Sequence, residues 1–282
     1  MTQFILKITC ADRPGIVAGV AQCIAGQGGN IIESAQYSDQ TTGTFFMRIA
    51  FAPAPDLSID AMRAAFAPIA EQFAFDWQIL DAEQKIRAAI MASKGGHCLN
   101  DLLYRVSTGR LPMKVTSVIS NHRTWQRRAE HDEIPYHYVP VTSETKVAQE
   151  ATLIALLEDQ QVDLIILARY MQVLTHDMCS QYSGRIINIH HSFLPSFKGA
   201  NPYHRAHARG VKMVGATAHY VTGELDEGPI IAQDVSMVDH ADSVDDLIAQ
   251  GQDIESRVLA RAVKAHIEQR VILNGNLTVV FK

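Results

Sequence analysis

Asn188, His190 and His191 lie where an apolar, strand-like segment gives way to a loop punctuated by proline and glycine, in the sequence INIHHSFLPSFKGANP of residues 187–202. Side chains at positions i and i+2 of a strand project from one face, so Asn188 and His190 are expected side by side, with His191 directed the other way. Ligands of open α/β sheets bind beyond the carboxyl ends of the strands. The segment therefore predicts two hydrogen-bonding groups at a binding edge. The alternative is a buried histidine satisfied within the core.

A cluster of carboxylates follows in the sequence TGELDEGP, where Glu224, Asp226 and Glu227 crowd a short loop. Like charges and partial burial raise the pKa of a carboxyl group, as suits a general base or a water-orienting carboxylate. We therefore expect a raised pKa in this cluster. The alternative is an ordinary acidic turn.

The first part of the chain, residues 1–81, is expected to form a small α+β domain. Strand patterns fall at residues 2–9, 30–38, 42–51 and 74–80, and helical patterns at 16–27 and 58–73. Period-two and helical spacing of apolar residues, with glycine and proline between them, indicate the order βαββαβ.

A connector at residues 82–84 leads to a second expected domain, 85–282. Strand patterns at residues 85–93, 114–121, 136–141, 162–168 and 184–190 are mostly separated by helical segments. Such alternation implies right-handed crossovers and a mainly parallel, Rossmann-like sheet. Residues 211–222 and 228–238 are close enough to pair antiparallel. A long helix near 243–269 and a strand at 277–281 follow them.

The composition favours a globular protein without a polyanionic partner. The chain has 282 residues, 47% of them hydrophobic, and a formal net charge of −5. We see no apolar run long enough to cross a bilayer and no signal peptide at the start. Four cysteines without a CxxC pair suit reduced thiols, so we expect a cytoplasmic protein.

Two other chemistries are considered and set aside. Twelve histidines raise the possibility of a metal site built from His190, His191, Asp226 and the pair His204 and His207. No HExxH motif or cysteine cluster supports it, so no metal is expected. The segment HRTWQRRAEH mixes arginines with Trp125, but a solvated helix face is favoured over nucleic-acid binding.

Three segments together resemble the folate-dependent formyltransferase family: NIHHSFLP, HYVTGELDEGPII and LARYMQVLT. The resemblance implies that Asn188, His190 and Asp226 handle the formyl group of 10-formyltetrahydrofolate, and that the backbone of residues 167–175 holds the pterin ring. Substrate contacts are expected, by the same resemblance, at Met171, Gln172, Leu174, Thr222, Glu224, Lys198 and His191. His219 is expected as a supporting partner of this site, and the alternative is a histidine of the core.

Within that family the chain looks like the formyltetrahydrofolate deformylases. It has His191 where glycinamide ribonucleotide formyltransferases usually have proline, and SKGGHCLNDLL in place of a glycine-rich phosphate loop. The βαββαβ unit, with DRPGIV and GGNI, is similar to an ACT regulatory domain, and the ending VILNGNLTVVF also fits. The implied reaction is hydrolysis of 10-formyltetrahydrofolate to formate and tetrahydrofolate without a cofactor, which would supply formate for purine synthesis.

Two alternatives stay open: formyl transfer to an amine acceptor, and a catalytically inactive amino-acid sensor. The presence of Asn188, His190 and Asp226 counts against the sensor. In the hydrolase, Asn188 and a protonated His190 are expected to stabilise the negative oxygen. Asp226 is expected to orient His190 and to position or deprotonate the water. His191 and Lys198 are expected to fill the space of an amine acceptor.

The ACT-like resemblance implies a site for a small amino acid at Asp12, Pro14, Gly15 and Asn30, with the turn at 12–15 facing the turn at 28–30. Backbone amides at a helix start suit a carboxylate. Methionine or glycine would be natural effectors. Such units commonly pair edge to edge, so a homodimer or homotetramer is expected. The alternative is that the unit dimerises and binds no amino acid.

Overall fold

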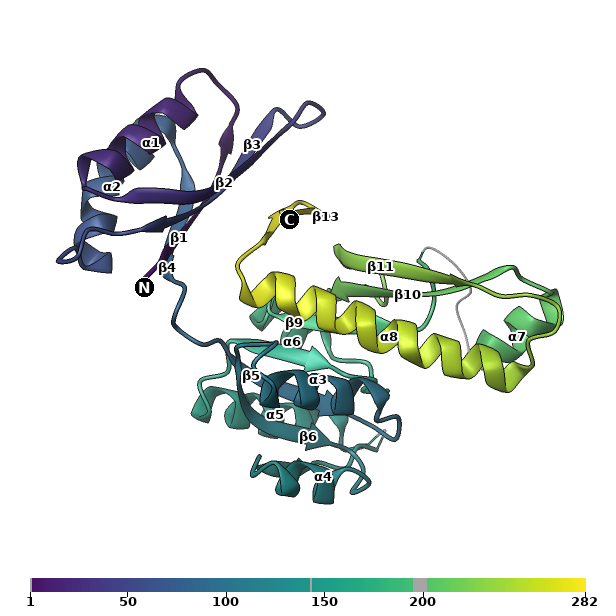
Figure 1. The fold of residues 1–282 in the computed structure, drawn as a ribbon. Helices are drawn as coiled ribbons and strands as arrows, with labels where there is room; N and C mark the ends of the chain where they lie inside the picture. Colours follow the sequence, from purple (N-terminus) through teal and green to yellow (C-terminus); the bar gives the residue numbers. More distant parts are fainter. Residues whose placement is uncertain (1, 143, 195–201) are drawn as a thin grey trace. The chain divides into compact units, whose positions relative to one another are not determined.

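The computed structural model describes residues 2–142, 144–194 and 202–282 (Figure 1). Two compact units divide the chain: residues 1–85 with 268–274 and 279–282, and residues 86–267 with 275–278.

The expected second domain, 85–282, therefore does not keep all of its last residues, because several of them group with the first unit. Within that unit the Arg48 guanidinium donates to the backbone oxygens of Glu268 at 3.0 Å and Gln269 at 3.2 Å. Asn274 donates to the Asp39 carboxylate at 2.8 Å. These bonds join residues more than two hundred positions apart, a distance over which local sequence patterns carry no information.

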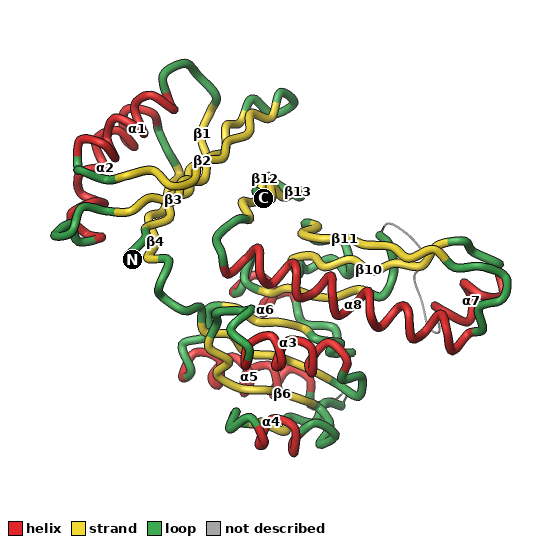
Figure 2. The backbone as a smooth tube through the Cα atoms, viewed as in Figure 1, coloured by secondary structure: helices red, strands yellow, loops and turns green. Residues whose placement is uncertain are grey.

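The first unit has the expected order βαββαβ. Its elements are β1 Phe4–Ala11, α1 Ile16–Gly26, β2 Asn30–Asp39, β3 Thr44–Ala52, α2 Ile59–Phe73 and β4 Asp76–Asp81. The strands form one antiparallel sheet in the order β2-β3-β1-β4, with α1 and α2 beside it (Figure 2). Alternate strand residues such as Leu6, Ile8 and Met47 pack with Val20 of α1 and Phe66 of α2 to form its core.

The second unit contains a seven-stranded sheet in the order β11-β10-β9-β8-β5-β6-β7. The pairs among β5 to β9 are parallel, whereas β10 runs antiparallel to both β9 and β11. The mainly parallel sheet and the antiparallel pair expected from the sequence are therefore confirmed. The elements are β5 Arg87–Ala92, α3 His97–Ser107, β6 Lys114–Ser120, α4 Gln126–His131, β7 Tyr136–Tyr138, α5 Lys146–Asp159, β8 Leu164–Leu167, α6 His176–Gln181, β9 Ile186–His190, α7 Pro202–Arg209, β10 Met213–Tyr220, β11 Ile230–Met237 and α8 Val244–Ile267. Two short strands, β12 Val271–Asn274 and β13 Leu277–Val280, close the chain.

Parallel strands place their carboxyl ends at one edge of the sheet, where the loops after β5, β8 and β9 begin. The central strands are almost wholly apolar: residues 164–167 have the sequence LIIL and all are buried. Such strands need cover on both faces, which the crossover helices supply. The polar residues that follow the strands are thereby held on a rigid support.

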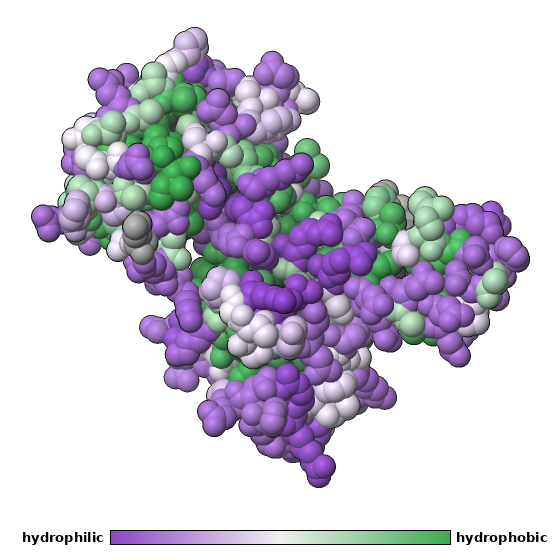
Figure 3. Space-filling view, in the orientation of Figure 1, coloured by the Kyte–Doolittle hydropathy of each residue, from purple (hydrophilic) through white to green (hydrophobic). Residues whose placement is uncertain are grey.

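Among the described residues, no helix is both long and apolar enough to span a membrane. The helix α8 is instead amphipathic, with Leu247, Ile254, Val258 and Leu259 buried. Hydrophilic side chains cover much of the face that α8 presents to the viewer in Figure 3.

Candidate active site

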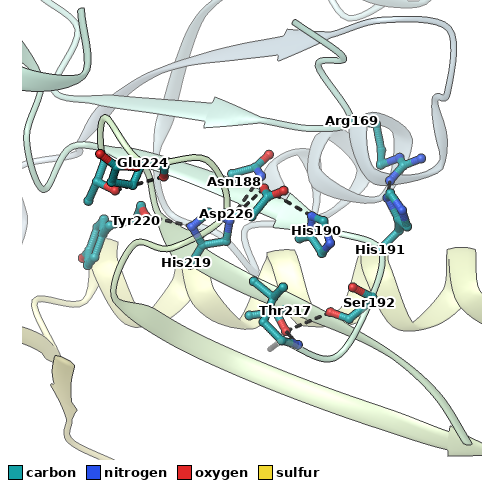
Figure 4. A network of polar contacts seen from close by, with 12 residues as sticks. Arg169, Asn188, His190, His191, Ser192, Thr217, His219, Tyr220, Glu224 and Asp226 are labelled. Carbon is teal, nitrogen blue, oxygen red and sulfur yellow. Dashed lines mark hydrogen bonds and ion pairs between the residues drawn. The ribbon is translucent and has the colours of Figure 1, made fainter. Parts of the chain in front are cut away.

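Asn188 and His190 lie on β9, at the edge where that strand ends (Figure 4). The antiparallel register with β10 pairs Asn188 with His219 and His190 with Thr217. Directly paired residues share a face of the sheet, so three of the expected polar groups are brought together by strand pairing. His219 could be suspected from the sequence, but its position opposite Asn188 depends on the register.

Asp226 approaches His190 from the loop after β10. Its Oδ1 atom lies 3.2 Å from Nδ1 of His190, and the two side chains are 17% and 10% exposed. The backbone of Asp226 is left-handed, with φ of 58°. A residue with a Cβ adopts this conformation at a cost, and such residues concentrate at functional sites.

The expectation of a raised pKa in the acidic cluster is wrong at Asp226. The hydrogen bond from His190 lowers the pKa of Asp226, and this effect outweighs the opposing effect of partial burial. The carboxylate therefore stays ionised and acts as an acceptor toward His190. The sequence predicted a raised pKa because Glu224 and Glu227 are neighbours of Asp226. It did not show that the His190 imidazole contacts the Asp226 carboxylate.

A chain of hydrogen bonds fixes the orientation of the Asn188 amide. Nδ1 of His219 lies 2.8 Å from the backbone oxygen of Tyr220, and because a carbonyl only accepts, Nδ1 carries the proton. Burial lowers the pKa of His219, so the ring is neutral and its Nε2 accepts. The Asn188 Nδ2 atom donates to this Nε2 at 3.3 Å. One amide hydrogen is thereby used, and the described residues supply no hydrogen-bond acceptor for the other.

His191 differs from its expected orientation. Because β9 ends at His190, the alternation of the strand does not extend to His191, and its ring stacks on that of His190 with centroids 4.8 Å apart. NH1 of Arg169 donates to Nδ1 of His191 at 2.9 Å. Burial, then the Arg169 charge and the neighbouring His190, lower the pKa of His191 to about 4.

A pocket of about 280 Å³ opens beside these groups. The ends of β8, β9 and β10 and the segments that follow these strands supply its walls, and they include the expected catalytic residues. Of the expected substrate contacts, those that line it are Met171, Gln172, Leu174, His191, Thr222 and Glu224. Lys198 lies outside the described residues.

Sequence reasoning missed Arg169 and Glu255. Arg169 has a left-handed backbone, with φ of 63°, and lines the pocket. Glu255 is 1% exposed on α8, between the buried residues Ile254 and Val258. A carboxylate on the apolar face of an amphipathic helix is a signal that the sequence did contain, because a buried charge requires partners.

The expected effector residues of the first unit do not all come together. Asp12 follows the end of β1 that pairs with Thr44, and its amide donates to Gly43. Asn30 pairs with Ala52, at the other end of β3. At about 3.3 Å per strand residue these ends are roughly 26 Å apart. The expected facing of the two turns is therefore wrong.

The fold and the site define a protein of the formyl transferase class, because the formyl transferase family matches residues 86–263, the unit that holds the pocket. A formyltetrahydrofolate deformylase from Synechocystis sp. is 49% identical over 277 residues, which cover 98% of this chain and 97% of that protein. The crystal structure of a formyltetrahydrofolate deformylase from Pseudomonas syringae pv. tomato matches with a TM-score of 0.97 and 48% identity, covering 100% and 95% of the two chains. The chain belongs to the formyltetrahydrofolate deformylase family.

A glycinamide ribonucleotide transformylase from Symbiobacterium toebii is also similar, with a TM-score of 0.66 and 32% identity. That likeness covers 70% of this chain and 95% of the other. Full-length similarity therefore favours the deformylases over the transformylases.

Proposed function

We propose that this chain hydrolyses the formyl group of 10-formyltetrahydrofolate to give formate and tetrahydrofolate. The observation that carries the proposal is the meeting of Asn188, His190 and Asp226 at one pocket, in a chain whose full-length relatives bear the deformylase name. The formate would serve purine synthesis and the balance of one-carbon pools.

Attack by water on the formyl carbon places negative charge on the formyl oxygen. Donors that are already oriented toward that oxygen supply a large part of the catalysis in such reactions. The Asn188 amide is oriented by His219, and its second hydrogen has no acceptor within the described part of the chain. We assign this hydrogen to the formyl oxygen.

His190 and Asp226 are suited to the proton transfers. The Asp226 carboxylate accepts from Nδ1 of His190 and stabilises the imidazolium, while Nε2 of His190 has no hydrogen-bond partner in the described part of the chain. As the water oxygen bonds to carbon, Asp226 takes one water proton. His190 then gives a proton to the folate nitrogen as the carbon–nitrogen bond breaks.

These residues supply the acid, the base and the oxyanion donor, so no cofactor is proposed. The four cysteines are free thiols, which suits the cytoplasmic location that we propose.

The test is incubation of the purified protein with 10-formyltetrahydrofolate in buffer that contains no amine. Formate is followed with a formate dehydrogenase assay and tetrahydrofolate by absorbance. We expect equal amounts of both products. If no formate is released, and the formyl group is transferred only after an amine is added, the transferase alternative is established instead.

The first unit is proposed to bind a small amino acid at the turn before α1. Gly15 caps α1 in a left-handed conformation, with φ of 93°, and supplies no side chain to bond the first helical amides. The Asp12 carboxylate, which accepts a hydrogen bond from Ser38, would meet the ammonium group of the ligand. The helix start would receive the ligand carboxylate.

Edge strand β2 is proposed to pair with a second copy of the chain. It lies at one end of the sheet order and exposes Ile32 and Tyr37. Exposed strand edges are usually covered, and a two-fold pairing would do so in a homodimer or homotetramer. Light scattering after size-exclusion chromatography should give a mass of at least two chains; a monomer mass would contradict the proposal.

A further inference from the structure

The loop that carries Asp226 joins β10 to β11 and spans residues 221–229. Its base is closed by the amide of Tyr220, which donates to the backbone oxygen of Pro229 at 2.9 Å. Within the loop, Asp226 is directed toward His190 (Figure 4) and has a left-handed backbone. A residue with a Cβ keeps such a conformation only where the surrounding structure holds it. The contacts that hold this loop therefore affect the position of the Asp226 carboxylate.

Two side chains near the end of the chain hold the loop on the side that follows Asp226. The Asn276 amide donates to the backbone oxygen of Glu227 at 3.3 Å. The Thr278 hydroxyl donates to the backbone oxygen of Ile230, the first residue of β11. One contact is thus made directly after Asp226, and the other is made where the loop ends.

These two contacts lie outside the substrate pocket. The described lining of the pocket includes residues 222–226, but it includes neither residues 227–230 nor Asn276 and Thr278. The two donors can therefore influence the chemistry only through the backbone on which Asp226 is carried. Their loss should change the rate of the reaction more than the binding of the substrate.

The turn that carries Asn276 is anchored in the first unit. Residues 275–278 group with the second unit, whereas residues 268–274 and 279–282 group with the first. The Asn274 amide donates to the Asp39 carboxylate at 2.8 Å. That carboxylate also accepts from the Thr41 amide at 2.9 Å and from the Thr42 hydroxyl at 3.0 Å, so its own orientation is fixed.

A single residue, Gly275, separates the two asparagines along the chain. Its backbone is left-handed, with φ of 57°, as suits a glycine in the tight turn between β12 and β13. The contact with Asp39 and the contact with the Glu227 backbone are therefore made two residues apart. A tight turn passes a displacement of Asn274 on to Asn276, which a long flexible linker would absorb.

The turn proposed to bind a small amino acid adjoins the same anchor. The hydroxyl of Ser38, the residue before Asp39, bonds to the Asp12 carboxylate. The Asp12 amide donates at 2.8 Å to the backbone oxygen of Gly43, in the turn that follows Asp39. A ligand at Asp12 would thus act on both sides of the residue that holds Asn274.

We propose that Asn276 and Thr278 are positioning residues for Asp226, and that the contact of Asn274 with Asp39 makes their hold on the loop depend on the first unit. This inference rests on the proposed hydrolysis for its biological meaning. The hold on the loop can be measured without substrate.

Hydrogen exchange of the backbone amides in residues 223–228, followed by mass spectrometry on the full chain, is the first readout. Asn276→Asp keeps the shape of the side chain but cannot donate, and Thr278→Val does the same for the hydroxyl. Each should speed exchange in this segment by about 3- to 10-fold, the range for loss of one hydrogen bond. The matched control is Leu277→Ala, because Leu277 lies between the two donors, is 65% exposed and has no polar side-chain atom. Equal exchange in all three variants would overturn the positioning role.

The dependence on the first unit is tested by exchanging partners. Asn274→Asp places a carboxylate against Asp39, so the contact is repelled and exchange in residues 223–228 should rise as in Asn276→Asp. The double variant Asn274→Asp with Asp39→Asn restores an amide facing a carboxylate and should return exchange to the wild-type rate. The amide oxygen at position 39 can still accept from Thr41. Unchanged exchange in Asn274→Asp, or no recovery in the double variant, would overturn the dependence.

Steady-state kinetics of formate release supply the second readout. Asn276→Asp and Thr278→Val should lower kcat by about 3- to 10-fold with little change in KM, and Asn276→Gln, which keeps the donor, should recover kcat. A change in KM alone would contradict the positioning role. A wild-type protein that releases no formate would count against the hydrolysis, while the exchange experiment would still decide whether Asn276 and Thr278 hold the loop.

Discussion

Nδ1 of His190 lies 3.2 Å from Oδ1 of Asp226, which joins the end of β9 to the loop after β10. This contact keeps Asp226 ionised and sets which nitrogen of His190 faces away from the carboxylate. The substitutions Asp226→Asn and His190→Ala should each lower kcat by at least about 100-fold, the lower range for a positioned acid or base. Formate release under saturating substrate measures the effect.

Both variants should keep a melting temperature close to that of the wild type, because the pair lies at a loop edge. If Asp226→Asn retains most of its activity, the Asp226 carboxylate does not take part in the proposed proton transfers.

The orientation of Asn188 should depend on His219. The substitution Asn188→Ala removes the donor and should lower kcat by about 10²- to 10³-fold, as is found for oxyanion donors. His219→Ala leaves the Asn188 amide free to rotate and should lower kcat by a smaller factor, about 10-fold. His219→Gln, whose side-chain oxygen can accept from Asn188, should recover activity toward the wild type. If His219→Ala and His219→Gln have equal kcat, the hydrogen bond does not orient the amide.

The stability of the protein should rise with pH between about 4 and 6.5 because of His191. The folded protein holds the pKa of His191 at about 4, while the ordinary value is 6.5. In this window the unfolded chain binds the extra proton, so the contribution is present above pH 6.5 and is lost as the pH falls toward 4. The variant His191→Asn should show a shallower fall in melting temperature over this range.

The exposed residue His240 provides the control for this experiment. The variant His240→Asn should keep the wild-type slope. His219, whose pKa is also lowered, accounts for slope that remains in the His191 variant. Parallel curves for the His191 and His240 variants would show that burial of His191 does not set the pH response.

Gly228 positions the loop of Asp226. A methyl group at Gly228 would overlap the backbone oxygen of Tyr220, so Gly228→Ala must displace the loop. We expect a loss of kcat of at least about 10-fold, since small displacements of catalytic groups cost up to 10²-fold. An added methyl group at Gly26 meets no atom within 4 Å, so Gly26→Ala is the control and should retain full activity. Equal kinetics for both variants would show that the loop tolerates displacement.

The amino-terminal unit should bind a small amino acid at the turn before α1. Calorimetry with the common amino acids, methionine and glycine included, should detect heat with the wild type and lose it in Asp12→Ala. The heat should be lost because, in the wild type, the Asp12 carboxylate pairs with the ammonium group of the ligand. If no amino acid gives heat or changes the kinetics of formate release, the unit serves oligomerisation alone.

Much of the fold follows from local patterns in the chain. The apolar runs that form β5, β8 and β9 and the helical spacing of α5 and α8 are properties of neighbouring residues, so their order and class were predictable. The strand β12, Val271–Asn274, was not predicted. The grouping of residues 268–274 with the first unit was missed because it depends on long-range bonds to Arg48.

The sequence by itself determined that an amide and an imidazole meet at the end of a buried strand, because the i and i+2 relation of Asn188 and His190 is local. Only the tertiary structure decided which residues face them. The register of β9 with β10 places His219 opposite Asn188, and loop packing brings Asp226 to His190 and lowers its pKa. The contact of Glu255 with Arg169 likewise arises from packing between segments that are distant in the sequence. The spacing of residues along the chain therefore does not predict it.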